Sequence, residues 1–246
     1  MQPTPPHPRA PWLTLALTLA LVALQGGCGS DSYELDLPRG FPEPRVPADN
    51  PLSEAKIELG RFLFYDVRLS ANQTQSCGSC HRQELAFTDG LPHAVGSTGE
   101  HTARGSMALG NAGYAATLNW ANQAVVTLEM QARIPLFGVE PVELGLGGME
   151  QVLEQRLRAD PSYPAMFAAA FPSEEDPITV QNVLRALASF ERALLTGDSP
   201  YDRYQAGDTT ALSDSARRGM ELFFSEKVEC FHCHGGFNMS GSVDHE

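Results

Sequence analysis

Apolar residues recur at helical spacing in several segments of the chain. The clearest pattern covers residues 183–194, where the apolar side chains fall on one helix face and stop before the turn at 197–200. A second helix is expected to begin at Ser53, a suitable N-cap, and to continue to about Tyr65. A weaker helical pattern covers residues 149–157. No segment alternates apolar and polar residues as a half-buried strand does, so the pattern predicts a mostly α-helical fold with long loops.

A weak internal repeat joins a helix to a cysteine motif. Leu52-Ser53-Glu54 leading to Gly60-Arg61-Phe62-Leu63-Phe64 is echoed by Leu212-Ser213-Asp214 leading to Gly219-Met220-Glu221-Leu222-Phe223. In each copy the glycine would let another helix approach closely, and the aromatic residue one turn later would pack against that helix. Because a Cys-x-x-Cys-His motif follows both copies, we interpret them as one unit that occurs twice rather than as two unrelated amphipathic helices.

The cysteines carry the strongest chemical signal. Apart from Cys28, all of them lie in two motifs, Cys77-Gly78-Ser79-Cys80-His81 and Cys230-Phe231-His232-Cys233-His234. In such a motif the thiols form thioethers with the haem vinyl groups, and the adjacent histidine binds the iron. A zinc site would need the two cysteine pairs much closer together in the sequence, and a thioredoxin-like centre would need strands around it. The sequence therefore predicts two covalently bound haem c groups, held by Cys77, Cys80 and His81 and by Cys230, Cys233 and His234.

Charge and the N-terminal segment bear on partners and location. The 246 residues contain 17 Lys and Arg against 30 Asp and Glu, a formal charge of −13, which argues against a nucleic-acid-binding protein.

Residues 1–28 have one charge, an apolar run of about 13 residues and a small-residue end, a pattern typical of an export signal and too short to span a membrane. Cys28 also fits the lipidated cysteine of a lipoprotein, with plain signal-peptidase cleavage as the alternative. Residues 29–47 are a proline-rich linker. We therefore expect a periplasmic protein, in contact with the membrane only through a lipid anchor at Cys28.

Several runs of residues resemble the bacterial di-haem cytochrome c peroxidase and MauG family over nearly all of residues 48–246. The first-haem signature is carried by Gly60-Arg61-Phe62-Leu63-Phe64, Arg68-Leu69-Ser70, the first cysteine motif and Ala86-Phe87-Thr88-Asp89-Gly90. Later matches are Trp120, Leu128-Glu129-Met130-Gln131-Ala132, Pro141-Val142-Glu143-Leu144 and Ala188-Ser189-Phe190-Glu191-Arg192. Residues 137–145 and 230–238 are most similar to the MauG-like branch that accompanies methanobactin-cluster copper proteins.

The resemblance implies two cytochrome-c-like haem domains, residues 48–175 and residues 176–246. The second is expected to be incomplete, because the sequence stops soon after His234 where family members continue. The haem of the first motif would react with hydrogen peroxide beneath Gln131 and Glu143, and Trp120 would relay electrons to the second, electron-transferring haem. A carboxylate such as Glu143 suits this chemistry because peroxide cleavage needs a proton moved between the two oxygens.

Two positions depart from the family pattern. Ser97 stands where many family members place a distal histidine, so the first haem iron is expected to be open on that side. Gly105 stands where the family has an asparagine that contributes to an interhaem calcium site, which puts calcium in doubt.

The function implied is peroxide-dependent oxidation of an exported partner protein. One alternative is a peroxidase that removes hydrogen peroxide with a small cytochrome or copper protein as electron donor. Another is a plain di-haem electron-transfer cytochrome, which needs the same two motifs but neither an open iron nor Glu143.

Overall fold

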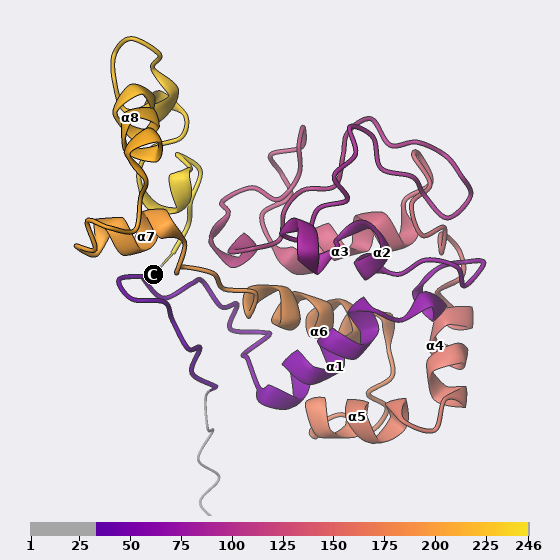
Figure 1. The fold of residues 1–246 in the computed structure, drawn as a ribbon. Helices are drawn as coiled ribbons and strands as arrows, with labels where there is room; N and C mark the ends of the chain where they lie inside the picture. Colours follow the sequence, from indigo (N-terminus) through magenta and orange to yellow (C-terminus); the bar gives the residue numbers. More distant parts are fainter. Residues whose placement is uncertain (1–32, 246) are drawn as a thin grey trace, which may run out of the picture. The chain divides into compact units, whose positions relative to one another are not determined.

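A computed structural model describes residues 33–245. The predicted export signal, the lipidation site Cys28 and the start of the linker therefore lie outside the described residues. The helices are α1 (Glu54–Phe64), α2 (Cys77–Cys80), α3 (Leu128–Phe137), α4 (Glu150–Ala159), α5 (Tyr163–Ala170), α6 (Val180–Arg192), α7 (Pro200–Gln205) and α8 (Asp214–Phe223). Short 3₁₀ turns lie at Val67–Leu69, Gln83–Leu85, Ala112–Tyr114, Cys230–His232 and Phe237–Met239. Figure 1 shows how these elements are arranged.

The closest helix contact is the crossing of α1 and α6, which lie side by side in Figure 1. A methyl group on Gly60 would lie 2.0 Å from the carbonyl oxygen of Ala186 and 2.8 Å from Cβ of Phe190. Only glycine therefore allows the two backbones to approach this closely. Both helices begin at side-chain caps, because the hydroxyls of Ser53 and Thr179 accept hydrogen bonds from backbone N–H groups in the first turn.

The remaining core forms around this crossing. Helices α3, α4 and α5 add the buried side chains of Leu136, Leu153, Leu157 and Phe167 to one continuous apolar cluster with α1 and α6. A largely buried ion pair also joins α6 to α3: Arg192 donates two hydrogen bonds to Glu129, of 2.7 and 2.8 Å. Asn50 donates to the same carboxylate at 2.8 Å, so the chain before α1 is fixed to α3 as well.

The mostly α-helical prediction is confirmed. Residues 33–245 contain helices and isolated bridges but no strand, and the helices expected at 53–65, 149–157 and 183–194 are α1, α4 and α6. Four helices were not predicted: α2, α3, α5 and α7. The domain boundary at 175/176 stays a prediction, although α6, which follows it, packs on α1 and belongs to the same core. No helix within the described residues is long and apolar enough to cross a membrane.

The second copy of the repeat also forms its helix, α8, ahead of the second motif. Its surroundings differ from those of α1, because no residue of α8 is buried and nothing described lies within 4 Å of a methyl group placed on Gly219. The segment after the motif contacts the core region through Phe237, whose ring lies 4.8 Å from that of Tyr114. Asn111 donates to Asn238 at 3.1 Å beside this contact.

The repeat provides a matched test of the helix crossing. Gly60→Ala should destabilise the protein by about 1–3 kcal/mol, because the added methyl group overlaps the α6 backbone. Gly219→Ala should instead stabilise α8 by about 0.5–1 kcal/mol, because alanine is the better helix former where space is open. Urea unfolding of both variants measures the two effects. Equal effects would contradict the close crossing at Gly60.

Candidate functional site

One cavity, partly open to solvent, brings together most of the predicted first-site residues. Its walls include Cys77, Cys80 and His81 from the first motif, Gln131 from α3, and Glu143 from the loop before α4. Leu187 and Glu191, one turn apart on α6, form another wall.

The first motif is held in place by the chain before it. Ser76 caps α2 and its backbone N–H donates to the hydroxyl of Ser79 at 3.0 Å, which fixes the turn that carries Cys77. The guanidinium of Arg156 on α4 donates to the carbonyls of Arg68, Ser70 and Ala71, at 3.1, 2.8 and 2.9 Å. Because these hydrogen bonds satisfy three loop carbonyls, they hold the segment that leads into the motif in place.

His81 is prepared to act as a metal ligand. Its Nδ1 lies 2.8 Å from the carbonyl of Phe87, and because a carbonyl only accepts, Nδ1 must carry the proton. Nε2 is then the ring nitrogen with the free lone pair, as a proximal ligand requires. Burial lowers the pKa of His81, opposed by the Phe87 carbonyl, so the imidazole is kept neutral. The ring of Phe64 packs 6.3 Å from it.

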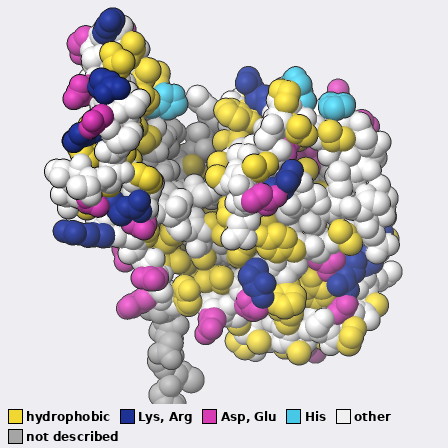
Figure 2. All heavy atoms as spheres, viewed as in Figure 1, with side chains coloured by type: hydrophobic (Ala, Val, Ile, Leu, Met, Phe, Trp, Pro, Cys, Tyr) yellow, Lys and Arg dark blue, Asp and Glu magenta, His cyan; other side chains and the backbone are white. Residues whose placement is uncertain are grey.

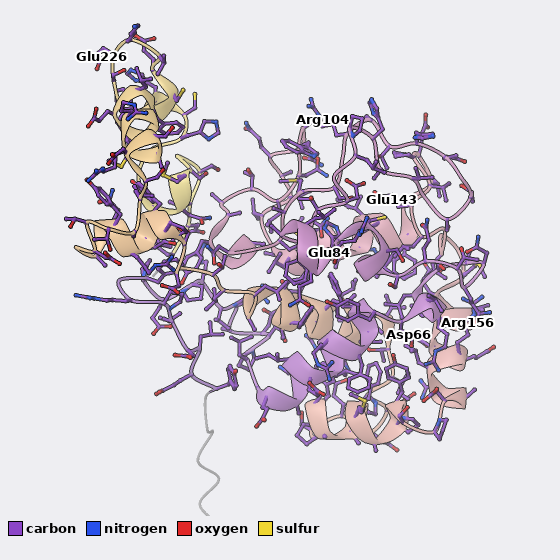
Figure 3. The ribbon with its side chains drawn as sticks, in the orientation of Figure 1. Asp66, Glu84, Arg104, Glu143, Arg156 and Glu226 are labelled. Carbon is purple, nitrogen blue, oxygen red and sulfur yellow. The ribbon has the colours of Figure 1, made fainter. Side chains whose placement is uncertain are left out.

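Two loops hold Glu143 at the cavity. Its carbonyl accepts from the backbone N–H of Ser97 at 2.7 Å, and a methyl group on Gly96 would lie 2.0 Å from the carbonyl of Val142, so the two loops are in direct backbone contact. The backbone N–H of Leu144 donates to the carbonyl of Pro135 on α3 at 2.9 Å. Burial alone raises the pKa of the Glu143 carboxyl. Figure 3 shows Glu143 beside α2 and α3.

Two buried polar atoms of the cavity wall have no hydrogen-bond partner in the described protein: Oε1 of Gln75 and Oε2 of Glu191. Glu191 is only 5% exposed, and burial raises its pKa to about 8. Sequence analysis assigned no role to either residue. Glu191 could have been noticed in the sequence as a charged residue on the apolar face of α6, one turn after Leu187.

These features fit the predicted haem. Both thiols and His81 line one cavity, the hydrogen bond at Nδ1 leaves the lone pair on Nε2, and two buried polar atoms of the wall have no partner in the described protein. Unpaired buried groups are costly, so their presence points to a polar ligand atom or water within the cavity.

Trp120 does not line this cavity. It is 57% exposed, its indole N–H donates to the carbonyl of Gly105 at 3.2 Å, and the guanidinium of Arg104 lies 5.5 Å from its ring. It borders a separate surface hollow with Thr88 and Asp89. Thr88, which lines that hollow, directly follows Phe87, whose carbonyl accepts the His81 proton.

The second motif repeats the histidine contact of the first. The rings of Phe223 and His234 are 6.4 Å apart at 47°, against 6.3 Å and 46° for Phe64 and His81. The helix, aromatic residue and histidine therefore pack alike in the two copies. Cys233 is exposed and Cys230 is half-buried.

Ser97 and Gly105, the two departures from the family pattern, have clear structural settings. The hydroxyl oxygen of Ser97 is buried without a hydrogen-bond partner in the described protein. At Gly105 a methyl group would lie 2.1 Å from the carbonyl of Leu91, so no larger residue fits this backbone.

Comparison with known proteins agrees with these features. A family profile described as di-haem cytochrome c peroxidase matches residues 54–210. The methylamine utilization protein MauG of Methylorubrum extorquens is 37% identical over 209 residues, which cover 85% of this chain and 56% of that protein. The cytochrome c551 peroxidase of Pseudomonas aeruginosa is 34% identical over 193 residues, 78% of this chain and 54% of that protein.

A solved structure of a MauG-like protein associated with microbial copper homeostasis is 46% identical, with a TM-score of 0.83. The match covers 87% of this chain and 61% of that chain. The present chain thus spans a little over half the length of these relatives.

The buried carboxyl of Glu191 should make stability depend on pH. Its pKa rises from 4.5 to about 8 on folding, so the unfolded chain ionises first and stability falls as pH increases between these values. Glu191→Gln removes this loss and should raise the free energy of unfolding by about 1–3 kcal/mol at pH 7. Urea unfolding of the haem-loaded protein at pH 5 and pH 7 measures the difference.

Glu175→Gln, at an exposed position before α6, serves as the control and should show no such dependence. A stability gap for Glu191→Gln that is the same at both pH values would show that the carboxyl does not titrate as described.

Proposed function

Because the chain belongs to the di-haem cytochrome c peroxidase family, we propose that it binds two haem c groups and uses hydrogen peroxide as an oxidant. Cys77, Cys80 and His81 would hold the first haem, and Cys230, Cys233 and His234 the second. The observation that carries this proposal is the cavity in which the first motif shares its walls with Gln131 and Glu143. A plain electron-transfer cytochrome has no need of a buried carboxyl with a raised pKa at its haem.

The chain's own contribution to peroxide cleavage is the movement of a proton. The haem supplies the oxidising and reducing power when it is bound. Glu143 in its ionised form would take a proton from one oxygen of hydrogen peroxide and return it to the other oxygen, which leaves as water. The raised pKa of this carboxyl suits both steps, because the group both accepts and releases the proton near its working pH. The Gln131 amide lines the same cavity and would orient the peroxide by hydrogen bonding.

Trp120 would connect the two haem sites. Its indole ring is readily oxidised. It borders a hollow that also contains Thr88, the residue after Phe87, whose carbonyl accepts the His81 proton. The second site would then deliver the oxidising equivalents to the substrate.

The substrate we propose is an exported partner protein with an oxidisable side chain, tryptophan above all. The support is the similarity to MauG and to the MauG-like protein associated with microbial copper homeostasis. The similarity to cytochrome c551 peroxidase favours the second candidate, removal of hydrogen peroxide with a small cytochrome or copper protein as donor.

The cellular location and the calcium site of this chain are also proposals. We propose export to the periplasm, where c-type haem is attached, with lipidation at Cys28 as the membrane anchor. Calcium at Gly105 has little support, because this backbone leaves no room for a ligating side chain.

Replacing Glu143 tests the proton transfer. Glu143→Gln in the haem-loaded protein should slow the reaction with hydrogen peroxide by about 10²–10⁴-fold, because the amide cannot carry the proton. The wild-type rate should fall as pH decreases through the raised pKa of Glu143, above 4.5, and the variant should lose this dependence. Stopped-flow absorbance measures both. Glu140→Gln changes an exposed residue in the same loop and should react at the wild-type rate. An unchanged rate in Glu143→Gln would show that Glu143 does not transfer the proton.

Replacing Trp120 tests the relay and the substrate together. Trp120→Phe retains the aromatic ring but should largely abolish oxidation of the second haem and of the partner protein. The measurement combines absorbance of the second haem with peptide mass spectrometry of the product of the neighbouring gene. Oxygen added to that protein by the wild type supports partner oxidation. An unmodified partner, alongside rapid oxidation of a small reduced cytochrome, would favour the peroxide-removing function.

A further inference from the structure

Tyr65 packs directly against the backbone of the first haem motif. It follows the last residue of α1, and a methyl group on Gly78 would lie 2.5 and 2.7 Å from its ring atoms Cδ1 and Cε1. Gly78 stands between Cys77 and Cys80, so the absence of a side chain there brings the Tyr65 ring onto the segment between the two thiols. Tyr65 as a whole is 46% exposed. Tyr65 therefore touches both the motif and the solvent.

A second route joins Tyr65 to the ligand histidine. The ring of Phe64 is fully buried and lies 6.3 Å from the His81 ring and 5.1 Å from the Tyr65 ring, at 75° to the latter. These are ordinary contact distances for aromatic pairs. An unbroken series of ring contacts thus leads from His81 to a solvent-exposed phenol.

The second copy of the repeat shows what the packing alone requires. There Phe223 takes the place of Phe64, and its ring lies 5.1 Å from Phe224 at 72°, matching the first copy. Phe224 is 40% exposed, close to the exposure of Tyr65. Phenylalanine therefore satisfies the ring contact at this position, and the hydroxyl of Tyr65 is not needed for it.

We propose that Tyr65 is a redox-active residue that carries one oxidising equivalent from the first haem site to the protein surface. The difference between the two copies is chemical: a tyrosine can lose an electron together with its phenolic proton, whereas a phenylalanine has no such proton and is much harder to oxidise. This inference rests on the proposed peroxide reaction at the first site and adds an outlet that does not pass through Trp120.

The step balances with hydrogen peroxide as the oxidant. One peroxide molecule takes up two electrons and two protons and becomes two molecules of water. Tyr65 supplies one of the electrons to the first site; its O–H bond breaks, the proton passes to solvent, and a neutral radical stays on the ring. A small one-electron donor at the surface reduces the radical, and a proton from solvent restores the phenol. The other electron comes from the second haem site.

The surface around Tyr65 is accessible to such a donor. Phe62 and Val67, on either side of Tyr65 in the chain, are also exposed. Figure 2 shows apolar side chains at the surface over the part of the view in which Figure 1 places α1.

Tyr163 is the other tyrosine near this end of α1, and its setting is less suitable. It is buried, so a surface donor cannot reach its ring, and the guanidinium of Arg68 lies 5.2 Å from that ring. A cation over the ring opposes the removal of an electron from it.

The experiment uses the full haem-loaded chain and hydrogen peroxide alone. Samples frozen within milliseconds of mixing are examined by electron paramagnetic resonance, and digested samples by mass spectrometry for oxygen addition or dityrosine at Tyr65. We expect a tyrosyl radical and modification at Tyr65 in the wild type. Tyr65→Phe, which copies Phe224, should lose both, and ferrocyanide added before peroxide should suppress both in the wild type. Peroxide consumption by the wild type is recorded separately.

Two control variants locate the radical. Tyr33→Phe removes an exposed tyrosine outside the α1 region, and Tyr163→Phe removes the buried one; both should retain the signal. A signal that persists in Tyr65→Phe, or that disappears in Tyr163→Phe, overturns the proposal. Peroxide consumption without any radical or modification at Tyr65 overturns it while leaving the proposed function standing. A wild type that consumes no peroxide overturns both.

Discussion

The contact between α1 and α6 at Gly60 is the constraint on which the rest of the described fold depends. Backbone atoms of one helix meet the Cα of the other there, so the crossing leaves no freedom to slide. Once α6 is fixed, Leu187 and Glu191 face the cavity, and the next residue, Arg192, reaches Glu129 on α3. The position of Gln131, two residues further along α3, is therefore set indirectly by a glycine on α1.

The same crossing explains why buried polar groups collect around the cavity. Removing either partner of the Arg192 and Glu129 pair would leave a buried charge unpaired, so the pair specifies the register of α3 on α6 more than it adds stability. Glu191 has no such partner, and its Oε2 stays unbonded beside the motif. A fold that tolerates an unpaired carboxyl at one place has given up some stability there, which is the usual signature of a functional site.

A helix or a site residue could be predicted from the sequence where a short stretch of chain determines it. Helices α1 and α6 carry a cap and a clear apolar face, so their sequences alone predict them. Helix α3 contains Pro135, and α5 is apolar on every side, so neither shows the 3.6-residue period that marks a helix. The placement of Glu143 depends on pairing between loops that are far apart in the chain, which no local pattern encodes; only the family resemblance indicated it.

The two copies of the repeat distinguish contacts set by the helix and motif alone from contacts that depend on the rest of the fold. The histidine of each motif meets an aromatic residue at nearly the same distance and angle, although α1 is packed beneath α6 and α8 has no buried residue. The helix and motif therefore set the histidine contact by themselves, within one short stretch of chain. What distinguishes the two sites comes from the side chains added around that unit. At the first motif these are the carboxyl of Glu143, the carboxyl of Glu191 and the phenol of Tyr65, each supplied by a different part of the chain.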